Sequence, residues 1–158
     1  MTLFAPLFDA TKPNLTKMMD AHSGLLYWDE QLEVYYQQYR KLTGQFWIPH
    51  EVSLRGDVRD WQGTMNDDQR ELFKRGISQL VLLDSIATQA DGHMADYIQN
   101  PAIKTLLFYI ASQEGIHNES YTYICTSFMT KEEADAVFLR PKTDPKVIGA
   151  TQAILDKF

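Results

Sequence analysis

The chain has 158 residues, of which 44% are hydrophobic, and 15 basic residues against 21 acidic ones give a net charge of −6. This length supports one hydrophobic core rather than two independent ones, and the acidic balance without a Lys/Arg run excludes a nucleic-acid backbone or an anionic membrane as the main partner. The single cysteine, Cys125, excludes an internal disulfide, and without a secretory leader pattern or a run of about 18 apolar residues we expect a cytoplasmic protein.

The N-terminal third of the chain contains one predicted helix between two irregular segments. Residues 1–26 have two prolines and no sustained hydrophobic period, so we expect an N-terminal arm. Residues 27–42 contain neither Gly nor Pro and predict a helix that ends at Gly44. Residues 46–63, which include Pro49 and two glycines, predict an irregular connector.

Two long helices are predicted in the middle of the chain. Asn66 can cap the first, with Gln69 in the capping-box position, and nothing interrupts this helix before Gly92. The second is expected to begin with Asn100 as cap and Pro101 at its first position, and to run to residue 128.

Two shorter helices are predicted at the C-terminal end. Thr130 and Glu133 form a second capping box, and Asp144 with Pro145 starts a last helix that runs to the C-terminus. Because the chain shows no alternating strand pattern, we predict an all-α fold in which residues 27–158 form a helical half-bundle.

Both long helices carry ionisable side chains within their apolar faces. The hydrophobic spacing of the two faces selects these residues: Phe73, Ile77, Leu80, Asp84, Ala87 and Asp91 on the first helix, and Ile103, Leu107, Ile110, Glu114, His117, Tyr121, Ile124 and Phe128 on the second. A buried carboxylate costs several kcal/mol unless it is protonated, paired or bound to a metal. A metal site is therefore one interpretation of Asp84 and Glu114.

Glu114 and His117 form a Glu-x-x-His pattern, which places a carboxylate and an imidazole one turn apart on the same helix face. Ferritin-like di-iron bundles use two such patterns, together with one carboxylate from each of two further helices. The sequence contains half of that ligand set, because none of its other histidines follows a Glu by three residues. Tyr121, one turn beyond His117, would lie close to a metal bound there.

Three segments together resemble the small, radical-generating subunit of class I ribonucleotide reductase. These segments are QFWIPHEVSL (45–54), QLVLLDSIATQ (79–89) and ASQEGIHNESYTYI (111–124). The resemblance implies a ferritin-like bundle in which Asp84, Glu114 and His117 bind metal and Tyr121 carries a radical. It also implies that Trp47 relays electrons.

The resemblance further implies an oxidoreductase that acts only within a complex. A di-metal centre reacts with oxygen and generates a tyrosyl radical, which is passed to a large subunit that reduces ribonucleotides to deoxyribonucleotides for DNA replication. Iron is the expected metal, with manganese or a mixed Mn/Fe centre as alternatives. Acid should release the metal, because the histidine ligand binds as neutral imidazole.

The family's second ligand set is missing from these 158 residues, so we expect the N-terminal part of a split subunit or a truncated one. A partner chain with a second Glu-x-x-His pattern would complete the site, and the completed small subunit is expected to form a dimer. Two copies of this chain could instead complete each other.

Two other functions stay open: a ferritin-like di-metal oxidase not coupled to nucleotide reduction, and a non-catalytic helical assembly module. Several aromatic side chains near the N-terminus are expected to serve packing: Tyr27, Trp28, Tyr35, Tyr36 and Tyr39.

Overall fold

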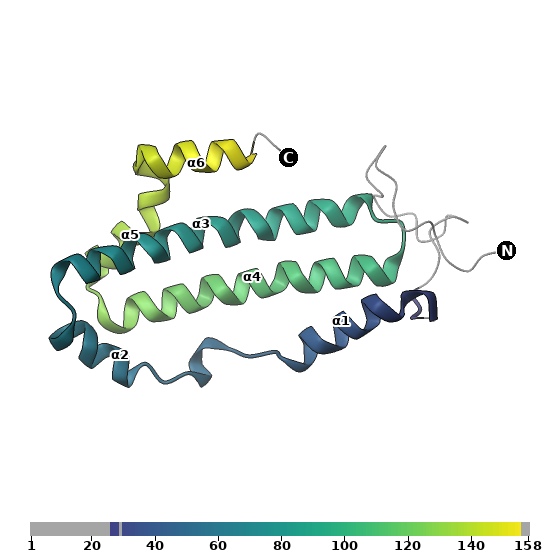
Figure 1. Ribbon diagram of the computed structural model, residues 1–158, viewed down its shortest axis with the longest axis horizontal. Coiled ribbons are helices and arrows are strands. Elements are labelled where there is room, and N and C mark those ends of the chain that lie inside the picture. Colours follow the sequence, from purple (N-terminus) through teal and green to yellow (C-terminus); the bar gives the residue numbers. More distant parts are fainter. Residues whose placement is uncertain (1–25, 29, 156–158) are drawn as a thin grey trace. The chain divides into compact units, whose positions relative to one another are not determined.

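The computed structural model describes residues 26–28 and 30–155, so almost all of the predicted arm, residues 1–26, lies outside the described part (Figure 1). The described residues form helices and no β-strand, which confirms the all-α prediction. In chain order the elements are η1 (Glu30–Leu32), α1 (Glu33–Gly44), η2 (Pro49–Glu51), α2 (Arg55–Arg59), η3 (Asp60–Thr64), α3 (Asp67–Tyr97), α4 (Pro101–Phe128), α5 (Lys131–Thr143) and α6 (Pro145–Leu155). None of the described helices combines the length and hydrophobicity needed to cross a membrane.

The chain divides into two compact units, and the division crosses both long helices. Residues up to 47 and residues 87–114 make the first unit, and residues 48–86 and 115–158 make the second. Each unit therefore contains one part of α3 and one part of α4, which run antiparallel to each other (Figure 1).

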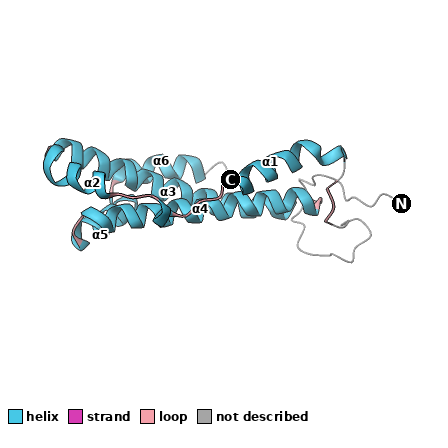
Figure 2. Ribbon diagram, turned by 90° about the horizontal axis from the view of Figure 1, so that it is seen from below, coloured by secondary structure: helices cyan, strands magenta, loops and turns pink. Residues whose placement is uncertain are grey.

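The first unit forms where α1 lies along the N-terminal part of α4 (Figures 1 and 2). Its buried residues are Leu32, Ala102 and Ile103, and the partly buried Trp28, Tyr35 and Ile98 pack against them. Asn100, which is 1% exposed, caps α4 as predicted: its Oδ1 accepts hydrogen bonds from the backbone N–H groups of Ala102 at 2.9 Å and Ile103 at 3.3 Å.

The second unit has an aromatic core. Its buried residues are Trp61, Ile77, Cys125, Met129, Ala134 and Val137. The Trp61 ring meets the rings of Phe73 and Phe128 at centroid distances of 5.8 and 4.9 Å. Burial raises the pKa of the Cys125 thiol to about 11, so this side chain is a neutral, apolar part of the core.

Helix α5 is tied to α3 by three polar contacts along one face of α3. The three α3 residues are spaced three and four apart, which places them on adjacent turns. The contacts are Glu71 with Arg140 at 2.8 Å, Lys74 Nζ with Glu133 Oε1 at 2.6 Å, and the buried Ser78 Oγ with the Val137 carbonyl at 2.7 Å.

The two predicted capping boxes form. Asn66 and Gln69 exchange side-chain to backbone hydrogen bonds of 2.9 Å in both directions at the start of α3. At α5, the Thr130 N–H donates to Glu133 Oε2 at 3.0 Å, and the Glu133 N–H donates to Thr130 Oγ1 at 3.2 Å. Glu133 thus uses one carboxylate oxygen for its helix cap and the other for Lys74.

Three predictions about the helices were wrong. The helix predicted to begin at residue 27 begins instead with the 3-10 turn η1 at Glu30 and is α-helical only from Glu33. Leu32, which precedes α1, makes no side-chain cap that could mark this start in the sequence.

Helix α3 does not stop at Gly92 but continues to Tyr97, because a glycine in a helix interior costs only about 1 kcal/mol relative to alanine and the chain meets no proline before Pro101. The predicted irregular connector, residues 46–63, instead contains the short helical elements η2 and α2 and most of the π-turn η3. Short one-turn elements of this kind have no periodicity that a sequence pattern can reveal.

The contact between Glu71 and Arg140 makes stability depend on pH. Hydrogen bonds from Arg140 and then Arg75 lower the pKa of Glu71 from 4.5 to about 2. Because the folded-state pKa is the lower one, the stabilisation is complete above pH 4.5 and is lost as the pH falls toward 2. We expect the difference in thermal midpoint between the native chain and Glu71→Gln to shrink across this range in a pH series. The exposed Glu132→Gln variant, one position before the cap residue Glu133, serves as control, and a difference that stays constant would contradict the prediction.

Candidate metal centre

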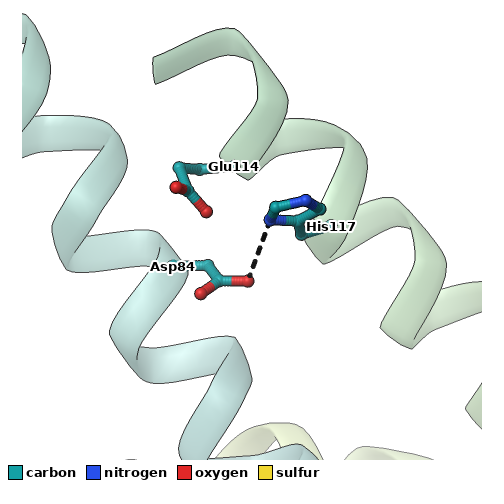
Figure 3. Close-up of side chains that lie close together, drawn as sticks. All are labelled: Asp84, Glu114 and His117. Atoms are coloured by element: carbon teal, nitrogen blue, oxygen red, sulfur yellow. Dashed lines mark ion pairs between the residues drawn. The ribbon is translucent and has the colours of Figure 1, made fainter. Parts of the chain in front are cut away.

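Three predicted ligand side chains come together between the two long helices. Asp84 projects from α3, and Glu114 and His117 project from adjacent turns of α4 (Figure 3). Each offers one ligand atom, and these atoms all lie within 4.8 Å of one another. Within the described part of the chain, no other group of three His, Cys, Asp or Glu side chains meets this condition.

The Asp84 side chain is more enclosed than that of His117, which is 39% exposed. The Asp84 side chain is 16% exposed, and its Oδ2 lies 3.6 Å from Nδ1 of His117. The same oxygen accepts a 2.6 Å hydrogen bond from the Tyr121 hydroxyl. The phenol of Tyr121 is therefore joined directly to one predicted ligand and lies on the same helix as the other two.

Asp84, His117 and Tyr121 belong to the second unit, and Glu114 is the last residue of the first. Glu114 and His117 are nonetheless placed by one continuous helix, α4, in which residues three apart share a face.

The donor set fits a divalent transition metal. Two carboxylates and one imidazole suit iron, manganese or zinc better than calcium or magnesium, which prefer oxygen ligands alone. Three protein ligands leave coordination positions for further ligands. A pair of metal ions would need more carboxylates and a second imidazole, which no described residue contributes to this group.

The remaining predicted site residue, Trp47, lies in the segment between α1 and η2 and is partly buried. Its role as a relay stays a prediction. Asp91, on the same sequence pattern as Asp84, is not part of the cluster, and burial raises the pKa of its carboxyl group.

Sequence reasoning missed Gln113, the residue immediately before Glu114. Its side-chain Nε2 is buried, and no described group accepts a hydrogen bond from it. A buried donor without an acceptor costs about 1–3 kcal/mol. Glutamine on a helix carries no sequence signal for such a position, so only the structure identifies it.

Comparison with known proteins gives a consistent result along the whole described chain. The family model described as ribonucleotide reductase, small chain, matches residues 28–157. A ribonucleoside-diphosphate reductase subunit beta from Halalkalibacterium halodurans is 27% identical over 155 residues, which are 96% of this chain and 45% of that protein. The chain thus spans about half the length of the curated relatives it matches.

Solved structures agree with the sequence match. A putative class I ribonucleotide reductase from Bacillus halodurans aligns with a TM-score of 0.75 and 28% identity, over 78% of this chain and 44% of that one. The dimanganese(II) NrdF of Streptococcus sanguinis aligns with a TM-score of 0.77 over 84% of this chain and 47% of that one; its 22% identity supports the shared helical fold alone.

Proposed function

The chain belongs to the ribonucleotide reductase small-chain family, and from this premise we propose that it supplies one half of a di-metal centre that generates a tyrosyl radical. Asp84, Glu114 and His117 are the proposed metal ligands, and Tyr121 is the proposed radical site. The observation that carries the proposal is the 2.6 Å hydrogen bond from the Tyr121 hydroxyl to Asp84 Oδ2 within the cluster of ligand atoms.

The ligand chemistry supports iron, with manganese or a mixed Mn/Fe centre as alternatives. Carboxylate and imidazole ligands serve both metals, and a structural neighbour is named as a dimanganese(II) protein. When bound, the metal pair would react with oxygen and so supply the oxidising power that removal of one electron from a tyrosine requires.

When Tyr121 is oxidised, its electron and its proton would go to different acceptors. A phenol that loses an electron becomes a strong acid, and its proton needs a base within hydrogen-bond distance. Asp84 Oδ2 is such a base for Tyr121 at 2.6 Å. The proton therefore moves to a defined atom, and the neutral radical stays on the ring.

The surroundings of Tyr121 would protect this radical. Its side chain packs against the buried core of the second unit. Cys125, one turn further along α4, has a thiol that burial holds neutral, with a pKa of about 11. A thiol donates an electron far less readily than a thiolate, so Cys125 is a poor competitor for the radical.

The second set of ligands would come from outside these 158 residues. We propose a chain with a second Glu-x-x-His pattern as the source, or a second copy of this chain, so that residues 27–158 act as a half-bundle. The completed small subunit would form a dimer and pass its oxidising equivalent through Trp47 to a large subunit that reduces ribonucleotides.

The test is electron paramagnetic resonance with metal analysis after Fe(II) or Mn(II) and oxygen are added, on the chain alone and mixed with a family chain that carries the second ligand set. We expect a tyrosyl signal that Tyr121→Phe abolishes. Tyr123→Phe is the matched control, since its hydroxyl donates to the Val52 carbonyl at 3.2 Å rather than to a ligand.

Three results would contradict the proposal in different ways. A signal that survives in Tyr121→Phe would place the radical elsewhere. Metal uptake with oxygen consumption but no radical would indicate an oxidase. Absence of metal in every mixture would leave the non-catalytic helical assembly module as the remaining function.

A further inference from the structure

A continuous series of oxidisable aromatic rings crosses the first unit. The Trp28 ring lies 5.5 Å from the rings of both Tyr36 and Tyr39, and Tyr39 lies 5.8 Å from Tyr109 on α4. These are centroid distances typical of rings in contact. The series therefore connects the segment before η1, through α1, to the helix that carries Glu114 and His117.

The composition of this series differs from that of the other aromatic cluster. Every ring in it belongs to Trp or Tyr, which can lose one electron to a strong oxidant. In the second unit, Trp61 contacts Phe73 and Phe128, and a phenylalanine ring is far harder to oxidise. Apolar packing alone explains the second cluster, but it does not require four oxidisable rings in the first.

The inner end of the series lies on α4, the helix that carries two of the proposed metal ligands, Glu114 and His117. Tyr109 precedes Glu114 by five residues, which is about 7–8 Å of axial rise. The outer end, Trp28, is only partly buried, so a soluble reductant can approach it.

The hydrogen bonds of the two tyrosines on α4 give them different redox roles. The Tyr109 hydroxyl donates to the backbone carbonyl of Leu42 at 3.2 Å, and an amide carbonyl is too weak a base to take the proton. The Tyr121 hydroxyl donates to a carboxylate. A radical on Tyr121 can therefore lose its proton and persist. A radical on Tyr109 keeps its proton and is reduced by the neighbouring ring.

We propose that Trp28, Tyr39 and Tyr109 form a one-electron relay between the protein surface and the metal-bearing part of α4, with Tyr36 as a side branch. The inference rests on the proposed function for its natural oxidant, the oxidised metal centre. Tyr109 would give one electron to that centre while its hydroxyl proton stays in the hydrogen bond to the Leu42 carbonyl. Tyr39 would refill Tyr109, Trp28 would refill Tyr39, and a soluble donor of the ascorbate or thiolate class would lose one electron at Trp28. Any proton that the donor releases goes to solvent, and the rings end unchanged.

This relay is separate from the proposed Trp47 route. It would carry electrons from a soluble donor to the metal centre when no large subunit takes up the oxidising equivalent. The sequence alone favoured a packing role for the rings near the N-terminus, because Tyr109 is about 70 residues further along the chain and no pattern connects it to them. The structure supplies that missing ring and with it the contact to α4.

The test uses the whole chain without metal. In the variant Ser112→Cys, an exposed position on α4 close to Tyr109 and Glu114, a ruthenium–bipyridine photo-oxidant is attached; the native Cys125 is fully buried and is not labelled. The flash excites the Ru(II) label, and a dissolved oxidative quencher such as hexaammineruthenium(III) takes one electron from it. The resulting Ru(III) form takes one electron from the protein, and transient absorption follows the tryptophan radical. We expect this signal to be absent in Trp28→Phe, which lacks the ring that is observed. It should also be absent in Tyr39→Phe and Tyr109→Phe, which interrupt the path to that ring.

Tyr35→Phe is the matched control, because it makes the same change on the same helix at a ring that packs on the first-unit core outside the series. Equal Trp28 radical yields in the Tyr39→Phe and Tyr35→Phe variants would overturn the relay, as would the absence of any Trp28 radical. Circular dichroism checks the fold of each variant. The photo-oxidant replaces the metal, so failure of the relay and failure of the proposed metal centre give separate results.

Discussion

Replacing His117 with alanine is expected to weaken Mn(II) or Fe(II) binding by more than about 100-fold, because loss of even a hydrogen-bond partner of a metal ligand typically costs about 10–100-fold. His117 provides the only imidazole in the cluster of ligand atoms. The change leaves Asp84 with its hydrogen bond from Tyr121, so the carboxylate keeps a partner and the fold is expected to survive.

Isothermal titration calorimetry with Mn(II), on the chain alone and in the completed mixture, measures this loss. His93→Ala is the matched control, because His93 is exposed on α3 and its ring contacts Tyr97 at 5.3 Å, outside the cluster. If His117→Ala and His93→Ala bind Mn(II) with the affinity of the native chain, the proposed ligand set is wrong.

Replacing Trp61 with alanine is expected to lower the free energy of unfolding by about 3–5 kcal/mol. Trp61 is 6% exposed and joins Phe73 to Phe128 in the second-unit core. Two cations also lie over its ring: Lys74 Nζ at 5.6 Å and the Arg70 guanidinium at 5.9 Å. Because whole domains are stable by only about 5–15 kcal/mol, the variant should be close to unfolding.

Urea denaturation followed by far-ultraviolet circular dichroism tests this without relying on tryptophan fluorescence. Trp61→Phe keeps an aromatic ring in the same place, so its free energy of unfolding should fall clearly less than that of Trp61→Ala. A loss for Trp61→Ala within about 1 kcal/mol, the size of an average substitution, would show that the core repacks around the missing ring.

The helix starts could be predicted because their signals are local. Asn66, Asn100 and Thr130 each bond to backbone groups two or three residues away, so the residue and its partner appear together in the sequence. The predicted helix end at Gly92 was wrong for the opposite reason, because a glycine weakens a helix without fixing where it ends. The end of α3 depends on the turn that leads to Pro101.

The candidate site was predictable only where one helix determines it. Glu114 and His117 share a face because they are three residues apart, but the contact between Asp84 and His117 joins residues 33 positions apart. Their positions on the two apolar faces suggested a shared metal site, and the family resemblance identified all three as its ligands. The bond between Tyr121 and Asp84 and the unpaired amide of Gln113 depend on side-chain orientations, which no sequence pattern specifies.

The two hydrogen-bonding roles of Glu133 couple secondary to tertiary structure. One oxygen caps α5 through Thr130, and the other binds Lys74 on α3, 59 residues away. These bonds, Lys74 first, lower the pKa of Glu133, so both depend on the same negative charge. Fraying of the first turn of α5 therefore removes the Lys74 contact together with the helix cap, so one side chain couples the start of α5 to its docking on α3.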